Sequence, residues 1–272
     1  MNIYAVKTWN QVGDSLALAG AVHNVRQVRP DIGFVYAGNP YYKPLFDHNP
    51  DFVYSDDFIL ISKDVCYGSG ERYAERGTII EANTRTLCEY LRIGMVPVSC
   101  GTAYVVLTDD EIEWGRRFEG KWLVNANAQT CSVSKWYPHW QDVVDGMLGM
   151  GLEVCQIGGR EKRDISSDLK GVEDWRGKTS LRQWLSMACN CAGIVSPPSG
   201  IVHAGAIWGK PMVVVTGARE HTGITAYPTV RHVTSECEHF GCRAQFKSEC
   251  RRWRGFSPCM DIPPEQVLRA LI

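Results

Sequence analysis

An aspartate and a lysine lie near the amino end of the sequence, and their spacing would let both side chains act on one hydroxyl group. Lys7-Thr8 follows an apolar run, and Gly13-Asp14 comes shortly after it. A carboxylate at this place can act as a general base that takes a proton from an acceptor hydroxyl, and Lys7 can orient that acceptor. Asp14 can equally be the N-cap of the helix that begins there, so both roles are open. The segment has no complete GxGxxG motif, so a dinucleotide is not expected there.

Three loops further along the chain carry groups that suit a phosphate. Asn125–Ala128 is a loop of small and polar residues, and Lys135 after it offers a positive charge to an anionic leaving group. Gly158-Gly159 follows an apolar run, where glycines let a ligand approach the backbone. Pro197–Gly200 turns into a helix whose first N–H groups can bind a phosphate, with His203 close behind. A solvated lysine, a plain turn and a structural histidine would also explain these residues. The candidate donor-binding residues are Asn127, Lys135, Gly159, Ser199, Gly200 and His203.

Four of the eleven cysteines crowd into one stretch near the carboxyl end. Four thiolates can hold a tetrahedral Zn²⁺ or an iron ion, and such a closed site would be structural rather than catalytic. The spacing contains no CxxC pair, so reduced cysteines without a metal are the alternative. Basic and aromatic residues between the cysteines could contact phosphates or nucleobases, or could form a solvated surface. The candidate metal ligands are Cys237, Cys242, Cys250 and Cys259.

These loops need strands and helices to position them, and the amino-terminal part of the sequence alternates between the two. Apolar strands are predicted at Ile3–Thr8 and Ile32–Ala37, on either side of an amphipathic helix at Asp14–Val28. Thr108 and Glu111 have the spacing of a capping box, which predicts a short helix to about Phe118. Other predicted elements are helices at Pro40–Asn49 and Thr78–Ile93 and strands at Phe52–Tyr54 and Phe58–Ser62.

The same alternation begins again after Glu119. We therefore expect an amino-terminal domain of residues 1–119 and a carboxyl-terminal domain of residues 120–272. Two series of this kind predict an α/β fold with two parallel sheets, whose ligands bind beyond the carboxyl ends of the strands, in the cleft between the domains. The second series contains strands at Trp122–Asn125, Leu152–Ile157, Gly193–Ser196 and Met212–Thr216, and helices at Trp140–Met150, Ser180–Asn190, Ser199–Trp208 and Pro264–Ile272.

The composition narrows the class of protein. The 272 residues are 44% hydrophobic and 22% charged, which is typical of a globular chain with a core. A formal net charge of -1 gives no electrostatic attraction of the whole molecule to nucleic acid. No apolar run is long enough for a membrane helix, and the amino end does not resemble a signal peptide. With an odd number of cysteines, these features predict a cytoplasmic protein without a disulfide framework.

The block from Gly177 to Gly217 resembles the carboxyl-terminal signature of glycosyltransferase family 9, the ADP-heptose:lipopolysaccharide heptosyltransferases. That family has a GKTSL segment before a helix, then the pattern V-x-D-[ST]-G-x-x-H-x-A-A-x-G-x-P and a strand that ends in glycine. Val6–Asp14, His48–Asp51, Lys135–Trp140 and Cys259–Leu271 are also similar to the family, so the resemblance runs along the chain in order. The matching residues of the block are Gly177, Lys178, Thr179, Ser180, Leu181, Ser199, Gly200, His203, Ala204, Ala206, Gly209, Pro211 and Gly217.

The resemblance implies a GT-B fold of two Rossmann-like domains, the first for the acceptor and the second for the nucleotide sugar. It also implies an inverting transfer that needs no cofactor, with Asp14 as the base. Relatives that glycosylate bacterial autotransporter proteins carry an iron-binding finger of four cysteines, which Cys237–Cys259 resembles. One departure concerns the donor: Pro198 stands where the family has an aspartate associated with the sugar diphosphate. ADP-heptose is therefore not assumed to be the donor.

The leading hypothesis is an inverting glycosyltransferase that uses a nucleotide-diphospho-sugar and acts on a hydroxyl of a glycan, a protein or a modified DNA base of the phage type. A non-catalytic nucleotide- or nucleic-acid-binding module with a metal finger is the alternative. A sugar-nucleotide epimerase on the same architecture is a third hypothesis, although it needs further acid and base groups that the sequence does not reveal. The oligomeric state is open.

Overall fold

A computed structural model describes residues 2–9, 11–65, 77–129, 135–160, 164–217, 221–237 and 256–272. The chain divides into two compact units. Unit 1 consists of Met1–Glu113 and Gly223–Tyr227, and unit 2 consists of Trp114–Thr222 and Pro228–Ile272. The division after Glu113 lies a few residues before the boundary expected at Glu119.

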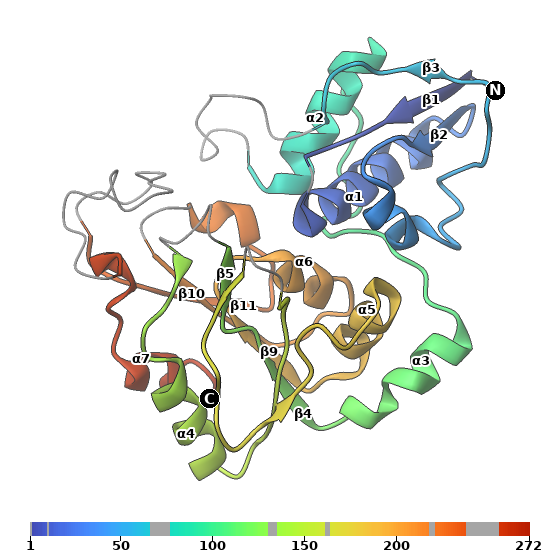
Figure 1. The fold of residues 1–272 in the computed structure, drawn as a ribbon. Coiled ribbons are helices and arrows are strands. Elements are labelled where there is room, and N and C mark those ends of the chain that lie inside the picture. The colour runs from blue at the N-terminus through green and yellow to red at the C-terminus, as the bar shows by residue number, and fades with distance from the viewer. Residues whose placement is uncertain are drawn as a thin grey trace. The chain divides into compact units, whose positions relative to one another are not determined.

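Unit 1 contains a parallel sheet of three strands in the order β2-β1-β3 (Figure 1). A lone bridge between Phe34 and Phe52 stands where a strand was expected at Phe52–Tyr54. The helix expected at Pro40–Asn49 is a shorter 3-10 helix, and the strand expected at Phe58–Ser62 covers two residues. The elements are β1 (Asn2–Val6), α1 (Val12–Val28), β2 (Ile32–Tyr36), η1 (Pro40–Phe46), β3 (Ile59–Leu60) and α2 (Ile79–Leu91).

Helix α1 lies in the core of unit 1 and is not amphipathic, contrary to the expectation from its sequence. Every residue from Asp14 to Val22 is buried, because α2, η1 and β2 all pack against the helix. At Gly20 a Cβ would lie 2.4 Å from the carbonyl oxygen of Thr102, so glycine permits this close approach. The buried side chain of Asn24 donates to Thr84 Oγ1 on α2 and accepts from the Cys100 N–H at 2.8 Å, and so satisfies polar groups within the core.

Unit 2 contains a parallel sheet of six strands in the order β11-β10-β9-β4-β6-β8, and a separate antiparallel pair, β5 and β7. The strands predicted at Gly193–Ser196 and Met212–Thr216 are confirmed at those bounds, whereas β5, β7, β8 and β11 were not predicted. Two elements cross the divisions between the units, α3 (Asp109–Gly115) and η5 (Thr222–Thr225). The elements of unit 2 are η3 (Arg116–Phe118), β4 (Lys121–Val124), β5 (Asn127–Gln129), α4 (Trp140–Gly149), β6 (Glu153–Gln156), β7 (Asp164–Ser166), β8 (Glu173–Asp174), α5 (Leu181–Asn190), β9 (Gly193–Ser196), α6 (Gly200–Ile207), β10 (Met212–Thr216), β11 (Val230–Thr234), η6 (Pro258–Met260) and α7 (Pro264–Arg269).

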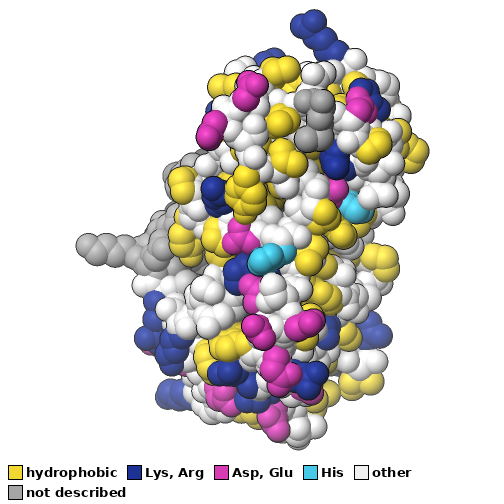
Figure 2. Space-filling model, turned by 90° about the vertical axis from the view of Figure 1, so that its right-hand side faces the viewer, with side chains coloured by type: hydrophobic (Ala, Val, Ile, Leu, Met, Phe, Trp, Pro, Cys, Tyr) yellow, Lys and Arg dark blue, Asp and Glu magenta, His cyan; other side chains and the backbone are white. Residues whose placement is uncertain are grey.

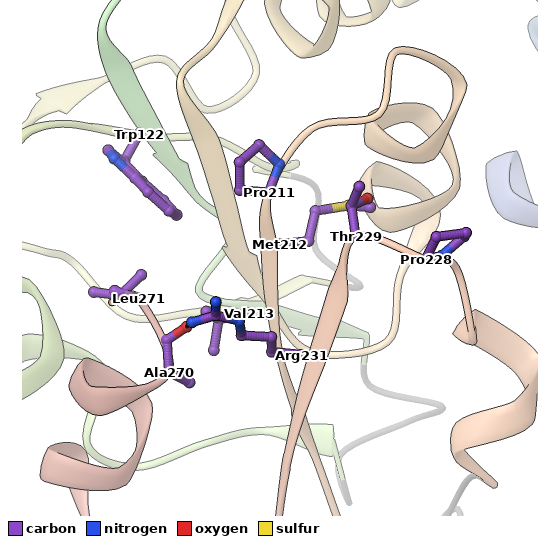
Figure 3. Close-up of a pocket in the computed structure, with 9 residues that line it drawn as sticks. All are labelled: Trp122, Pro211, Met212, Val213, Pro228, Thr229, Arg231, Ala270 and Leu271. Carbon is purple, nitrogen blue, oxygen red and sulfur yellow. Dashed lines mark hydrogen bonds between the residues drawn. The ribbon is translucent and has the colours of Figure 1, made fainter.

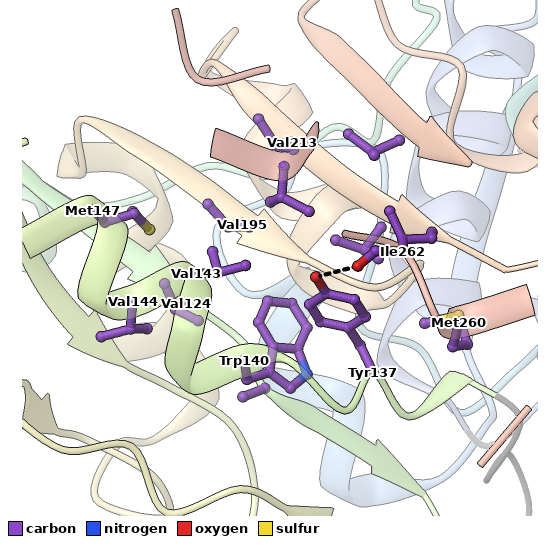
Figure 4. Close-up of a cluster of buried hydrophobic side chains, with 14 of the residues drawn as sticks. Val124, Tyr137, Trp140, Val143, Val144, Met147, Val195, Val213, Met260 and Ile262 are labelled. Carbon is purple, nitrogen blue, oxygen red and sulfur yellow. Dashed lines mark hydrogen bonds between the residues drawn. The ribbon is translucent and has the colours of Figure 1, made fainter. Parts of the chain in front are cut away.

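Helices cover both faces of this six-stranded sheet. Figure 4 shows the core on one face, where Trp140 and Tyr137 pack against Val195 and Val213, and Tyr137 donates to the carbonyl of Ile262 at 2.8 Å. Helices α4 and α7 contribute to this cluster. Helix α6 lies on the other face, because a Cβ on Gly205 would meet Ile194 and Met212, which alternate with Val195 and Val213 along their strands.

Two of the helix starts confirm capping signals in the sequence. The Thr108 N–H donates to Glu111 Oε2 at 2.8 Å while the Glu111 N–H donates to Thr108 Oγ1 at 3.3 Å, which is the predicted capping box. Ser180 makes the same reciprocal pair with Gln183 at the start of α5. Within the described parts of the chain, no helix is long and apolar enough to cross a membrane.

The surface seen in Figure 2 carries both signs of charge in close alternation. Lysine and arginine side chains lie beside aspartate and glutamate side chains over this face, rather than in a patch of one sign. This arrangement agrees with the net charge of -1.

Candidate functional site

Asp14 and Lys7 both lie at the carboxyl end of β1 in unit 1. Lys7 directly follows β1, and Asp14 lies in the first turn of α1 with 7% of its surface exposed. The N-cap of α1 is Gln11, because the helix begins at Val12, two residues before Asp14. The N-cap role considered for Asp14 is therefore wrong. A carboxylate in the first turn still interacts favourably with the helix dipole.

Lys7 has an ion-pair partner in unit 1. Its Nζ lies 3.8 Å from Asp64 Oδ1, and both side chains are more than a third exposed. A contact of this length between exposed groups is weak, so an anionic ligand could displace Asp64. Lys7 therefore lies at the end of the first strand, as the sequence predicted.

The predicted donor-binding loops of unit 2 follow three neighbouring strands. β9, β4 and β6 are adjacent in the sheet and parallel, so their carboxyl ends lie at one edge. Asn127 after β4 and Gly159 after β6 meet there, since Asn127 Nδ2 donates to the Gly159 carbonyl at 2.8 Å. Gly158 makes room for that amide, because its φ is 133° and a Cβ would lie 2.4 Å from Asn127 Nδ2.

Lys135 lies against the loop that leads into α6. Its Nζ donates to the Pro198 carbonyl at 3.1 Å, next to the N-cap residue Ser199. Gly200 is the first residue of α6, and His203, 5% exposed, follows in the same helix. The structure therefore places Lys135, Ser199 and Gly200 together, with a cation beside a helix amino end, where the free N–H groups and the helix dipole both favour an anion.

Two polar residues that the sequence reasoning did not select complete this loop. Asn125 follows β4 directly, and its Nδ2 donates to Ser196 Oγ at 3.2 Å and to Ser199 Oγ at 3.0 Å. The hydroxyls of Ser196 and Ser199 lie 2.8 Å apart. The available signal was position, because Asn125 and Ser196 both stand at the carboxyl ends of predicted strands.

The buried side chain of Arg176 holds together the segments that form β7 and β8. Arg176 has 4% of its surface exposed, and its guanidinium contacts Asp174 at 2.9 Å and Asp168 at 2.7 Å. It also donates to Ser166 Oγ at 2.7 Å, which ties β7 to β8. The hydrogen bonds from Arg176 hold the pKa of the Asp174 carboxyl well below its usual range. These contacts anchor the loops rather than offer groups to a ligand.

The cysteines predicted to hold a metal are only partly within the described chain. Cys237 follows β11 and Cys259 lies in η6, and both pack against the hydrophobic cluster beneath α4 and α7. Cys242 and Cys250 lie outside the described residues. Among the residues that are described, no three side chains of metal-ligating type gather at one point.

A pocket of about 400 Å³ lies in unit 2, and none of the residues that line it is a predicted site residue (Figure 3). It is bordered by Trp122 at the start of β4, Met212 at the start of β10 and Arg231 at the start of β11. These are the amino ends of parallel strands, whereas the candidate donor loops follow the carboxyl ends. The pocket is therefore separate from the candidate site.

Comparison with solved structures identifies the fold. The structure of the E. coli ADP-heptose lipopolysaccharide heptosyltransferase II matches with a TM-score of 0.69 and 14% identity, over 100% of this chain and 97% of that chain. The iron-containing dodecameric glycosyltransferase TibC of enterotoxigenic E. coli matches with a TM-score of 0.68 and 14% identity, over 99% and 75% of the two chains. The E. coli heptosyltransferase WaaC with ADP matches with a TM-score of 0.58 and 15% identity, over 86% and 93%. These matches confirm the predicted α/β fold of GT-B type.

The sequence comparison assigns the family. No curated protein matches the sequence. The model of glycosyltransferase family 9 (heptosyltransferase) matches residues 109–253, which are more than half of the 272 residues and include all the candidate donor-binding residues. A non-catalytic binding module is therefore not favoured. The chain belongs to glycosyltransferase family 9, and it is a heptosyltransferase-like glycosyltransferase.

Proposed function

We propose that this glycosyltransferase moves a sugar from a nucleotide-diphospho-sugar to an acceptor hydroxyl, with inversion at the anomeric carbon. The observation that carries the proposal is the match of residues 109–253 to the family. The hydrogen bonds from Asn127 to Gly159 and from Lys135 to Pro198, just before α6, support a donor site in that segment. WaaC and TibC were solved with ADP and with ADP-D-beta-D-heptose. Those complexes support a nucleotide sugar as the donor class.

The chemistry requires a base, an anomeric carbon and a stabilised leaving group. Asp14 removes the proton of the acceptor hydroxyl, and Lys7 orients the acceptor. The acceptor oxygen then forms a bond to the anomeric carbon on the side opposite the diphosphate. The bond from that carbon to the diphosphate oxygen breaks, and its electron pair leaves with the nucleoside diphosphate. No redox change and no cofactor is needed.

Unit 2 supplies the groups that stabilise the leaving diphosphate. Lys135 and the first N–H groups of α6 offer positive charge and hydrogen bonds to phosphate oxygens. His203 on α6 binds a phosphate or sugar hydroxyl, while Asn127 and the Gly159 backbone bind the nucleotide side of the donor. Unit 1 binds the acceptor. Pro198 at the position of the family's aspartate leaves the sugar unassigned. The reaction takes place in the cytoplasm, where nucleotide sugars are available.

The test of this proposal is the variant Asp14→Asn, assayed after thermal-shift screening of nucleotide sugars has identified a donor. Loss of a general base lowers kcat by about 10²- to 10⁴-fold, while the nucleotide Kd, measured by calorimetry, changes less than about twofold. Asp31→Asn is the matched control, because Asp31 is an exposed carboxylate paired with Arg29 beyond the other end of α1. Near-normal turnover by the Asp14→Asn protein would show that Asp14 is not the base.

We also propose that Cys237, Cys242, Cys250 and Cys259 hold one structural Zn²⁺ or iron ion. The packing of Cys237 and Cys259 on one hydrophobic cluster supports this role, because it brings together the two ends of the cysteine-rich stretch. TibC is an iron-containing relative in fold. Elemental analysis of the purified protein should find about one metal ion per chain, and Cys259→Ser should release it. A metal-free protein with unchanged thermal stability would reject the site.

A further inference from the structure

Three polar side chains at the carboxyl ends of β4 and β9 form a chain of hydrogen bonds in unit 2. Asn125 is 8% exposed, and its Nδ2 reaches Ser199 Oγ at 3.0 Å and Ser196 Oγ at 3.2 Å. Ser196 Oγ donates to the Pro197 carbonyl at 2.7 Å. Ser196 and Ser199 lie 2.8 Å apart through their hydroxyls. All four contacts lie within normal hydrogen-bond distances.

The donors in this chain can be assigned from the proton count. A carbonyl only accepts, so the single hydroxyl proton of Ser196 goes to Pro197. Ser199 must then donate its own proton to Ser196. The amide of Asn125 has two N–H protons, one for each serine. All of these protons are therefore used in hydrogen bonds among Asn125, Ser196, Ser199 and the Pro197 carbonyl. The Ser199 hydroxyl cannot donate a hydrogen bond to a ligand at the same time.

This arrangement changes the role of Ser199 at the start of α6. Ser199 is the N-cap residue, and a serine there ordinarily accepts a hydrogen bond from an N–H of the first helical turn. Here its side chain makes no such bond. Asn125 instead holds the hydroxyl toward β9, and Lys135 lies beside it on the Pro198 carbonyl. The first N–H groups of α6, at Gly200 and Ile201, have no acceptor within the helix.

On the basis of the proposed function, we infer that Asn125 is a positioning residue for the donor. It holds the Ser199 hydroxyl away from the helix end, so that the N–H groups of Gly200 and Ile201 stay open to a diphosphate oxygen. Without Asn125, the Ser199 side chain rotates to cap the helix and competes with the phosphate. Asn125 therefore acts through Ser199 and does not touch the donor itself.

The experiment titrates inorganic pyrophosphate into the full-length ¹⁵N-labelled protein and follows the amide signals of Gly200 and Ile201. Asn125→Ala should weaken pyrophosphate binding about fivefold, which is the worth of one N-cap hydrogen bond. Ser199→Ala should bind as the unchanged protein does. The double variant Asn125→Ala/Ser199→Ala should recover binding to within about twofold, because the competing hydroxyl is gone. A merely structural role for Asn125 gives no such recovery.

The outcomes separate this inference from the proposed function. If the unchanged protein binds pyrophosphate but the double variant binds as weakly as Asn125→Ala, Asn125 does not act through Ser199. If Ser199→Ala alone weakens binding, the hydroxyl is itself a ligand and the inference is wrong. If pyrophosphate moves neither amide signal in the unchanged protein, the donor site of the proposed function is wrong, and the role of Asn125 falls with it.

Two further variants control for folding. Asn190→Ala removes a partly buried amide that donates to the Ser186 carbonyl within α5, so it should leave pyrophosphate binding unchanged. Asn125→Ser keeps a donor at the position but supplies one proton instead of two. It should fold even if Asn125→Ala does not, and it should show a smaller loss that Ser199→Ala again reverses. Failure of that reversal would overturn the inference.

Discussion

Gly158 shows how one residue shapes the loops of the proposed donor site in unit 2. Its φ of 133° is a conformation that side-chain-bearing residues rarely adopt, and the space where a Cβ would lie is filled by the amide of Asn127. That amide donates to Gly159 and so joins the loops after β4 and β6. A larger residue at 158 would therefore strain the backbone and push Asn127 aside at the same time.

We predict that Gly158→Ala weakens nucleotide binding about five- to tenfold, because it displaces the hydrogen bond from Asn127. It should also lower the free energy of unfolding by about 1–3 kcal/mol through backbone strain. Gly209→Ala is the control, since Gly209 has a φ of 61° but no neighbour within 4 Å of its Cβ position. Calorimetric titration with ADP should show weaker binding only for Gly158→Ala. Equal affinities in the two variants would remove Asn127 from the donor site.

At the scale of elements, side chains hold an edge strand in place. β8 has only two residues, and it pairs with β6 through Cys155–Glu173 and Gln156–Asp174. Arg176 adds hydrogen bonds to Asp174 and to the β7 side chain Ser166. A two-residue strand gains little from backbone pairing alone, so these buried, charge-assisted bonds determine where it lies.

This network predicts acid sensitivity. The pKa of Asp174 is lowered in the folded protein, chiefly by its hydrogen bonds from Arg176, so the unfolded chain binds its proton first as the pH falls. The contribution of Asp174 to stability is present above the unfolded pKa of about 4 and is lost as the pH falls toward the folded value. Denaturation between pH 6 and pH 3 should show a smaller pH slope for Asp174→Asn than for the unchanged protein. The exposed Asp110→Asn serves as control, and an unaltered slope in Asp174→Asn would contradict the assignment.

In the whole molecule, unit 1 is built from two segments that are separated in the sequence by most of unit 2. Gly223–Tyr227 belongs to unit 1 although it comes late in the sequence. Within unit 1, Ile224 packs against a cluster of Ala17 and two α2 residues, Ile79 and Ile80. Burial raises the pKa of Tyr227 far above its ordinary value, which reflects how deeply this short segment enters unit 1. The stability of unit 1 therefore depends on residues from the carboxyl-terminal half.

We predict that Ile224→Ala lowers the stability of unit 1 by about 1–3 kcal/mol, because it removes apolar contacts from the cluster with α1 and α2. Hydrogen exchange should accelerate in the α1 and α2 amides, while the β9 and β10 amides keep their protection. Ile272→Ala is the control, since Ile272 is 84% exposed. Unchanged exchange in α1 would show that the segment is not part of the unit 1 core.

Features that depend on residues close together in the chain could be predicted from the sequence. The apolar runs at Gly193–Ser196 and Met212–Thr216 are strands, and the Thr108–Glu111 spacing is a capping box, because side-chain periodicity and capping act over a few residues. The motif order also indicated the family, which the match to residues 109–253 confirms. Candidate donor residues could be chosen because ligand-binding loops follow the carboxyl ends of parallel strands.

Contacts between residues far apart in the chain could not be predicted in this way. Asn125 and Ser199 are 74 positions apart, and no local pattern predicts their hydrogen bond. The polar residues of β8 form a strand only because β6 and Arg176 pair with them. Helix α1 lost its expected polar face because three elements pack around it. Such contacts form only when distant segments of the chain pack together. In the folded protein, burial and long-range pairing then outweigh the secondary-structure propensity of the local sequence.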